Sequence, residues 1–352
     1  LPSPPIPSPP PQMQTPPLPS SHLPIQTATL NVTSAPGSSS VTLSAPEDVL
    51  RRTLDMFEKL AALTGTDTLA FGKAHLWPIF IFSARRPAVA HLNWSAEHVL
   101  GQHASPPLIV VINPDEYNAY RERWPQALLC TVPLANCGIS YCRWVVHSTF
   151  SWRMPFYWSF DDNITAFVTV TCSKPSVTST FLAALMDVQA IDNIQQIALV
   201  GFLRAIGVES CKVNEYVIDR ATIYKILLVN SSMCEGCNYV PELCKWEDIA
   251  FMCDLIAANR HLLKVQRFAY HAVTTHSGGC APVRASDALV HNWASDLSAH
   301  SSSVVVKLSR WLAAHNRKAP PASLERSRTL ASNASVGMLQ ALPCLPPSLP
   351  PS

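Results

Sequence analysis

Two adjacent aspartates, Asp161 and Asp162, interrupt an apolar and aromatic stretch that runs from Phe156 to Phe167. Burying a carboxylate is costly unless a cation or hydrogen-bond donors meet it. Carboxylate oxygens after a buried strand suit a hard divalent cation, Mg²⁺ or Mn²⁺, which would also bind the phosphates of a substrate. The alternative interpretation is a solvated turn. The apolar surroundings favour the cation, so we expect Asp161 and Asp162 to be metal ligands.

Basic residues follow another apolar run of the chain. Arg85 and Arg86 come shortly after the run Ile79–Phe82, and Arg143 lies on an expected helix. Arginine pairs well with phosphate through charge-assisted hydrogen bonds. These three side chains are therefore candidates to neutralise a diphosphate beside the aspartates. Glu116 follows the next apolar run in a similar way.

A second acidic pair, Glu247 and Asp248, follows Trp246 at the start of an expected helix. Carboxylates in a first helical turn often only complement the exposed backbone N–H groups and the helix dipole. The chemical alternative is a general base that takes the proton from an acceptor hydroxyl. That role requires the fold to bring the pair opposite Asp161 and Asp162.

One histidine and a group of cysteines are further candidate metal ligands. His276 ends an expected strand just before two glycines, where it could complete a metal shell. The spacing Cys234-x-x-Cys237 is typical of a zinc knuckle, whereas Cys244 and Cys253 do not repeat it. We therefore prefer the carboxylate metal site to a zinc site as the interpretation.

Apolar runs that alternate with helical segments predict how these residues are arranged. Continuous apolar strands separated by helices are typical of a mostly parallel α/β sheet. Ligands of such sheets bind outside the carboxyl ends of the strands. We therefore expect one sheet edge to gather the charged residues that follow the strands. The expected strands are Ile79–Phe82, Leu108–Ile112, a run beginning at Leu128, and Phe156–Phe160.

Further elements are expected around this core. A helix is expected from Ser44 to Gly65, with Ser44 and Glu47 at the spacing of a capping box. A strand followed by a helix is expected across residues 214–229. The other expected elements are a helix at 179–185, a strand at 195–202, a helix after Trp246, a strand at 265–276 and a helix at 286–318.

Composition and charge limit the functional classes. The 352 residues include 26 basic and 24 acidic side chains, and this net charge of +2 is no footprint for holding a polyanion along its length. No apolar run reaches the roughly 20 residues of a membrane-spanning helix. Eleven cysteines, an odd number at irregular spacing, favour reduced thiols. We expect an intracellular protein with no membrane partner, and Leu1 as first residue suggests a piece of a longer chain.

Proline-rich ends delimit the expected domain. Eleven of the first 24 residues are proline, and the last residues of the chain have the same character. Proline fixes φ and removes a hydrogen-bond donor, so such segments are typical of linkers. We expect a disordered linker at 1–45, a single domain at 46–318 and a disordered tail at 319–352. Within the domain, 75–285 is the expected core and 286–318 the C-terminal helix.

Five segments together resemble the TET-associated glycosyltransferase family: IFIFSARRPAVAHLNW, VVINPDEYNAY, VPLANCGISYCRWVV, FYWSFDDNITAF and KWEDIAFMCDL. The resemblance covers about residues 75–285, and its specificity lies in the order of the segments. That family includes phage enzymes thought to decorate modified DNA bases, and the carboxy-terminal domain of the growth-regulation-by-estrogen protein and its relatives. The resemblance implies a GT-A-like sheet flanked by helices and a nucleotide-sugar donor, which we take to be a UDP-sugar.

The resemblance also implies roles on the donor side of the site. Arg85 and Arg86 would contact the nucleotide. Glu116 would lie near the nucleoside, and Arg143 would approach the diphosphate or the ribose.

The same resemblance implies a metal site. Asp161, Asp162 and His276 would hold Mn²⁺ or Mg²⁺ on the diphosphate. The family pattern often has a third acid after the pair, and here that position is Asn163. An amide oxygen brings no charge, so this departure would weaken metal binding.

Two functions follow from the resemblance, and both stay open at this point. In the first, a metal-dependent glycosyltransferase moves a hexosyl or N-acetylhexosaminyl group to a hydroxyl of a nucleic-acid base or a protein, with Asp248 or Glu247 as the base. In the second, a degenerate domain serves as an interaction module in a larger nuclear regulatory protein. A nucleotidyltransferase-like enzyme would leave the Trp246-Glu247-Asp248 helix unexplained. An extruded DNA base would need only a local basic rim, for which the last expected helix offers Lys307, Arg310, Arg317 and Lys318.

Overall fold

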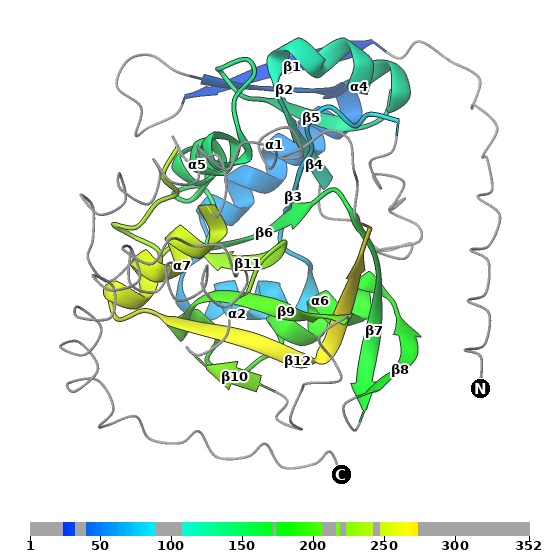
Figure 1. Ribbon diagram of the computed structural model, residues 1–352. Helices are drawn as coiled ribbons and strands as arrows, with labels where there is room; N and C mark the ends of the chain where they lie inside the picture. The colour runs from blue at the N-terminus through cyan, green and yellow to red at the C-terminus, as the bar shows by residue number, and fades with distance from the viewer. Residues whose placement is uncertain are drawn as a thin grey trace, which may run out of the picture.

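The computed structural model describes residues 24–31, 40–88, 108–171, 174–205, 216–218, 223–241 and 247–273. These residues form an α/β fold in which one large sheet is flanked by helices (Figure 1). The expected helix at 286–318, its basic side chains, and Trp246, Cys244 and His276 lie outside the described residues. No helix among the described residues is both long and apolar enough to cross a membrane.

The strands, in chain order, are β1 (Ile25–Asn31), β2 (Ser40–Pro46), β3 (Ile79–Phe82), β4 (Leu108–Ile112), β5 (Leu128–Thr131), β6 (Phe156–Asp161), β7 (Ile164–Thr171), β8 (Lys174–Ser179), β9 (Ile197–Arg204), β10 (Tyr216–Ile218), β11 (Ile226–Asn230) and β12 (His261–Ala272). The α-helices are α1 (Glu47–Ala61), α2 (Gly65–Ala74), α4 (Tyr117–Arg123), α5 (Ile139–Phe150), α6 (Phe181–Gln189) and α7 (Glu247–Ala257). Short 3-10 helices lie at Pro114–Glu116 and Ile194–Gln196. Within the described residues, the strand order is β1-β2-β5-β4-β3-β6-β11-β9-β12-β7-β8, with β10 beside β12.

Four neighbouring strands of this sheet are parallel, as the sequence predicts. β5, β4, β3 and β6 lie side by side, and each adjacent pair among them is parallel. β3 and β4 have the predicted bounds because each is a continuous run of apolar side chains that becomes almost fully buried. The carboxyl ends of the four strands consequently meet at one edge of the sheet.

The prediction of a mostly parallel sheet is wrong, because the sheet is mixed. β11 lies between β6 and β9 and is antiparallel to both. All residues of β11 except Asn230 belong to the segment 214–229, whose second half we expected to be helical. All five of them are buried, and such a short, fully buried apolar run is satisfied by strand pairing on both sides. Antiparallel pairing also places the start of β11 beside the end of β6.

The expected linker at 1–45 contains two strands. β1 and β2 pair as antiparallel neighbours, and β2 in turn pairs with β5. Val41, Leu43 and Ala45 alternate with smaller polar residues and are fully buried. The expected capping box does not form, because Ser44 belongs to β2 and its hydroxyl bonds to Tyr117. α1 begins after Pro46 without a side-chain cap.

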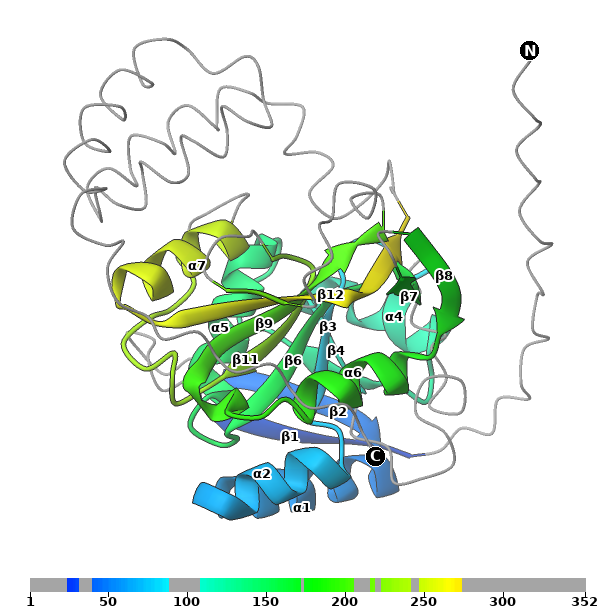
Figure 2. The same cartoon turned by 90° about the horizontal axis from the view of Figure 1, so that it is seen from below.

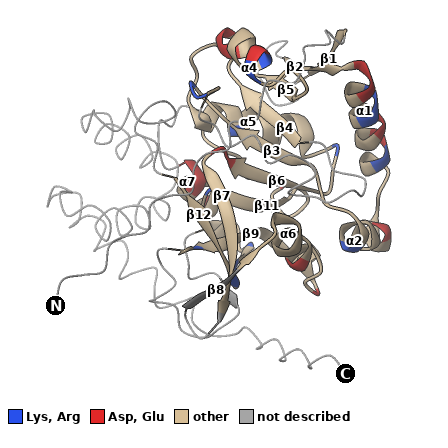
Figure 3. Ribbon diagram, turned by 90° about the vertical axis from the view of Figure 1, so that its right-hand side faces the viewer, with Lys and Arg blue, Asp and Glu red and all other residues tan. Residues whose placement is uncertain are grey.

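Helices cover both faces of the central strands (Figure 2). On one face, Phe150 of α5 packs on Phe80 of β3, with the ring centroids 4.8 Å apart. α7 lies beside α5 on this face. On the opposite face, Gln189 of α6 accepts a hydrogen bond of 2.9 Å from the indole of Trp158 in β6. Figure 3 shows acidic and basic residues interspersed along α1, and acidic residues at α7.

Candidate active site at the strand ends

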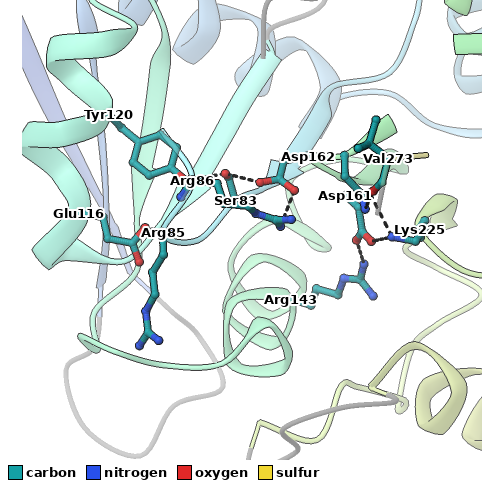
Figure 4. Close-up of polar contacts among 11 residues, drawn as sticks. Ser83, Arg85, Arg86, Glu116, Tyr120, Arg143, Asp161, Asp162, Lys225 and Val273 are labelled. Carbon is teal, nitrogen blue, oxygen red and sulfur yellow. Dashed lines mark hydrogen bonds and ion pairs between the residues drawn. The ribbon is translucent and has the colours of Figure 1, made fainter. Parts of the chain in front are cut away.

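Asp161 is the last residue of β6 and Asp162 is the first residue of the turn that follows, and their carboxylates have different partners. The carboxylate of Asp161 meets Arg143, which lies on α5. The carboxylate of Asp162 meets Ser83 and Arg86, which follow β3. Figure 4 shows the two carboxylates turned away from each other toward these different partners. The two aspartates therefore do not form one chelating pair.

Asp162 is fully buried and held by neutral and charged donors. Its Oδ1 lies 2.5 Å from Nη2 of Arg86, and Ser83 donates a hydrogen bond of 2.6 Å to its Oδ2. Because a serine hydroxyl has one proton, Tyr120 must donate to Ser83 in turn. Desolvation raises the pKa of Asp162 to about 6, although Arg86 and Ser83 oppose the shift.

Asp161 lies between two cations. Its Oδ1 is 2.8 Å from Nη2 of Arg143, and its Oδ2 is 2.8 Å from Nζ of Lys225. Desolvation alone would raise the pKa of Asp161, but Lys225 and Arg143 hold it below its usual value. Lys225 also donates a hydrogen bond of 3.0 Å to Oδ1 of Asn163. One ammonium thus links the first and third residues of the Asp161-Asp162-Asn163 segment.

Asn163 is fixed as an amide by its second contact. Its Nδ2 donates a hydrogen bond of 2.9 Å to the carbonyl of Val273, just after β12. The N–H of Val273 donates back to the carbonyl of Asn163 at the same distance. A carboxylate at this position would lose the donor to Val273, so the amide is suited to its place. These contacts orient the amide oxygen toward Lys225.

Arg143 joins the aspartates to the second acidic pair. While its Nη2 binds Asp161, its Nη1 lies 2.8 Å from Oε1 of Glu247 at the start of α7. The guanidinium is almost fully buried and lies over the ring of Phe82, 5.5 Å from the centroid. Desolvation raises the pKa of Glu247 to about 7 in spite of Arg143. The fold therefore brings the two acidic pairs together, as a base role for α7 requires.

Asp248 differs from Glu247 in its surroundings. It is half-buried, and its Oδ1 accepts a hydrogen bond of 2.8 Å from the N–H of Ile249. Desolvation raises its pKa, while Arg143 opposes the shift. Asp248 therefore satisfies the helix N-terminus and remains partly accessible, whereas Glu247 is buried against Arg143.

Arg85 and Glu116 lie together at the end of the neighbouring strands. The backbone N–H of Arg85 donates a hydrogen bond of 2.6 Å to Oε2 of Glu116, and Asn113 donates one of 2.9 Å to Oε1. Arg85 has a left-handed backbone conformation with φ of 58°. Its guanidinium is 3.4 Å from Oδ1 of Asn136. Glu116 thus fixes the turn at Arg85, and the side chain of Arg85 extends outward.

The described residues, as they are arranged, do not fit a divalent cation. Three of the four carboxylate oxygens of Asp161 and Asp162 accept a hydrogen bond, two of them from Arg143 and Lys225. The fourth, Oδ1 of Asp162, accepts no hydrogen bond but forms an ion pair with Arg86. The structure has no group of three or more His, Cys, Asp or Glu side chains suited to a metal ion within its described ranges. His276, the third expected ligand, lies outside those ranges, so its role stays a prediction.

The zinc interpretation gains no partners within the described ranges. Cys234 is fully buried, and its thiol contacts the carbonyl of Ala198. Desolvation raises the pKa of this thiol far above its usual value, which disfavours the thiolate that zinc requires. Cys253 faces the core from α7.

Sequence reasoning missed Lys225, Ser83 and Tyr120. Lys225 directly precedes the buried run of β11, just as Arg85 and Arg86 closely follow that of β3. A signal was therefore present, since a charged residue next to a buried run lies at a sheet edge. It was not used because the second half of the segment 214–229, which contains Lys225 and most of β11, was expected to be helical.

Comparison with known proteins gives a family match. No curated protein matches the chain. A solved structure described as "Crystal Structure of a Mycobacterial Protein" is similar with a TM-score of 0.37 and 10% sequence identity, over 61% of this chain and 72% of that one. The family model of the TET-associated glycosyltransferases matches residues 77–279, which is more than half of the chain and includes every described site residue named above. The chain belongs to the TET-associated glycosyltransferase family.

Proposed function

We propose that this domain transfers a sugar from a nucleotide-sugar donor to an acceptor hydroxyl at the edge where β3, β4 and β6 end. The observation that carries the proposal is the double ion pair of Arg143, which joins Asp161 to Glu247 across 2.8 Å on each side. It unites the two acidic pairs that a GT-A-like transferase would use for the donor and for the acceptor. Membership of a glycosyltransferase family supports the same function.

The donor side of the proposed site is the loop after β3. Arg86 is 12% exposed and Arg85 is largely open to solvent, so both guanidinium groups can meet an anionic ligand. Arginine binds phosphate through paired hydrogen bonds. We assign the nucleoside to the neighbourhood of Glu116. Arg143 is too deeply buried to act as a first contact for the diphosphate, and we assign it the positioning of Asp161 and Glu247.

Asp248 is the better of the two candidates for the base. It is half-buried, whereas Glu247 is buried and bound to Arg143. In the proposed step, the Asp248 carboxylate takes the proton of the acceptor hydroxyl. The acceptor oxygen then forms a bond to the sugar carbon, and the bond from that carbon to the diphosphate breaks. The nucleoside diphosphate leaves with the electron pair, so the proton and the charge are balanced.

The acceptor stays a choice between a modified nucleic-acid base and a protein hydroxyl. Both offer the hydroxyl that the step needs, and an extruded base requires only a short basic rim beside the site.

Calorimetric titration of the whole chain with UDP-glucose and with UDP-N-acetylglucosamine tests the donor site. We expect saturable binding, weakened at least about tenfold by Arg86→Met because a charged contact to phosphate is lost. Arg52→Met is the matched control, since Arg52 lies on the exposed face of α1. A folded protein that binds neither sugar nucleotide would contradict the proposed donor. The alternative, a scaffold without catalysis, would then be preferred.

A further inference from the structure

We propose that the ammonium of Lys225 takes the place that a divalent cation would have on this aspartate motif, so that donor binding does not depend on a metal. The proposal rests on the proposed function for the identity of the donor, but its first test needs no donor. It follows from the position of one side chain between two oxygens.

Lys225 lies where side chains of the motif converge. Asp161 ends β6, and Asp162 and Asn163 form the turn that follows. Asp161 and Asn163 each direct a side-chain oxygen to Lys225, while Asp162 binds Ser83 and Arg86. Nζ of Lys225 is 2.8 Å from Oδ2 of Asp161 and 3.0 Å from Oδ1 of Asn163. A metal held by the first and third residues of this segment would need the same two oxygens. The ammonium and the metal therefore exclude each other.

The motif is also built for a single positive charge. Asn163 contributes a neutral oxygen where a third acid would add charge, and Val273 fixes the orientation of that amide. The second oxygen of Asp161 is already bound to Arg143. A divalent cation brought close to two resident cations would be repelled by both. One ammonium, in contrast, satisfies one carboxylate oxygen and one amide oxygen.

The backbone holds Lys225 in this position. Its φ of 69° lies in the left-handed region, which residues other than glycine and asparagine seldom adopt. Such conformations persist where the surrounding structure fixes them, and they cluster at functional sites. The carbonyl of Lys225 accepts a hydrogen bond of 2.8 Å from the N–H of Asp161. The start of β11 is thus attached to the motif through both its backbone and its side chain.

An ammonium has three donors, and two of those of Lys225 are used by Asp161 and Asn163. The side chain is 19% exposed. A phosphate oxygen of the donor can therefore be the third partner. In this arrangement Lys225 binds the motif and the diphosphate together, which is the bridging role otherwise given to the metal.

Manganese titration of the whole chain, followed by electron paramagnetic resonance of free Mn²⁺, is the first experiment. We expect that Asp161 holds no Mn²⁺ in the wild type. The Mn²⁺ titration of Asp161→Asn should therefore match that of the wild type. Lys225→Met keeps an unbranched side chain, one atom shorter, and removes the charge. It is expected to bind Mn²⁺ at least about tenfold more tightly than the wild type. Lys225→Arg keeps the charge at the position, and Lys73→Met removes a remote exposed lysine; both should behave as the wild type.

Each outcome of this experiment decides the proposal. Mn²⁺ binding by the wild type that Asp161→Asn abolishes would overturn it, whether or not Lys225→Met folds. Equal binding by folded Lys225→Met and wild type would also overturn it.

Titration with UDP-glucose in EDTA separates this proposal from the proposed function. Binding in EDTA, weakened by Lys225→Met, supports both. Binding that requires Mn²⁺ contradicts the role of Lys225 but keeps the donor. A lack of donor binding under both conditions contradicts the proposed function, while the manganese titration still decides which cation occupies the motif.

Discussion

Arg143 and Glu247 form an ion pair of 2.8 Å although 104 residues separate them in the sequence. The pair is buried from solvent, and the other guanidinium nitrogen binds Asp161. Removing one partner of a buried ion pair leaves an uncompensated charge in a low-dielectric interior. Arg143 is therefore the residue on which the stability of the whole site depends.

Arg143→Met should destabilise the protein by about 3–5 kcal/mol at neutral pH, because Glu247 and Asp161 both lose a cation. Urea unfolding followed by circular dichroism measures this loss. Arg52→Met removes an arginine from an exposed ion pair with Asp48, and it should cost no more than about 1 kcal/mol. Equal effects of the two substitutions would contradict the assigned role of Arg143.

Glu247 should make the stability depend on pH. Its pKa is raised from 4.5 to about 7, so the folded state binds the proton more tightly than the unfolded state. The stabilisation of the folded state by protonated Glu247 is complete below about pH 4.5 and is lost as the pH rises through 7. The unfolding free energy of the wild type should consequently fall relative to that of Glu247→Gln between pH 5 and pH 8, an interval of about three units. A difference that stays constant or grows with pH would rule out this titration.

Ser83→Ala should destabilise the protein more than Tyr120→Phe. The first removes the hydroxyl that donates to the buried carboxylate of Asp162, at a cost of about 1–3 kcal/mol. The second removes the donor to Ser83 and the acceptor of a 3.3 Å hydrogen bond from the N–H of Arg86, at a cost of about 0.5–1.5 kcal/mol. Thermal unfolding of the two variants at neutral pH gives the order. The reverse order would mean that Tyr120, rather than Ser83, is the main support of Asp162.

Gly201→Ala should disturb the segment that carries Lys225. A Cβ on Gly201 of β9 would lie 2.6 Å from Cβ of Ile223 and 3.2 Å from the carbonyl of Ile226. Relief of this clash must shift backbone, and overpacking of this kind costs about 1–3 kcal/mol. Gly72→Ala is the comparison, since its new methyl would meet only the side chain of Trp77, at 3.1 Å. Denaturant unfolding should show the larger loss for Gly201→Ala, and similar losses would contradict the tight packing of β9 on this segment.

The parallel half of the fold could be predicted from the sequence, while the antiparallel half could not. β3 and β4 are continuous apolar runs, and their bounds follow directly from that pattern. The residues Ile226–Asn230 make an equally apolar run, but nothing in the run itself tells whether it is parallel to β6. Because this run was expected to be helical, Lys225 was not placed at the end of β6.

The candidate site shows the same division. The sequence predicts that charged residues immediately after apolar runs lie at one sheet edge, and they do, since strand ends meet there. The partners of Asp161 and Asp162 could not be derived, because they come from distant segments of the chain. Asp161 meets Arg143 and Lys225, and Asp162 meets Ser83 and Arg86. Ser44 was assigned to a capping box that its sequence spacing satisfies, yet pairing of β2 with β5 gives it a different partner.

The insertion of β11 between β6 and β9 has a consequence for the assembly of the site. The parallel strands alone leave Asp161 without Lys225 and Arg143 without Glu247. Lys225 contacts Asp161 across 64 positions of the chain, and Arg143 contacts Glu247 across 104. Both contacts are non-local, so each requires a long segment to be closed. The ion pairs of Asp161 and Glu247 are therefore complete only when β11 and α7 are in place, and a partly folded chain without them should carry no competent site.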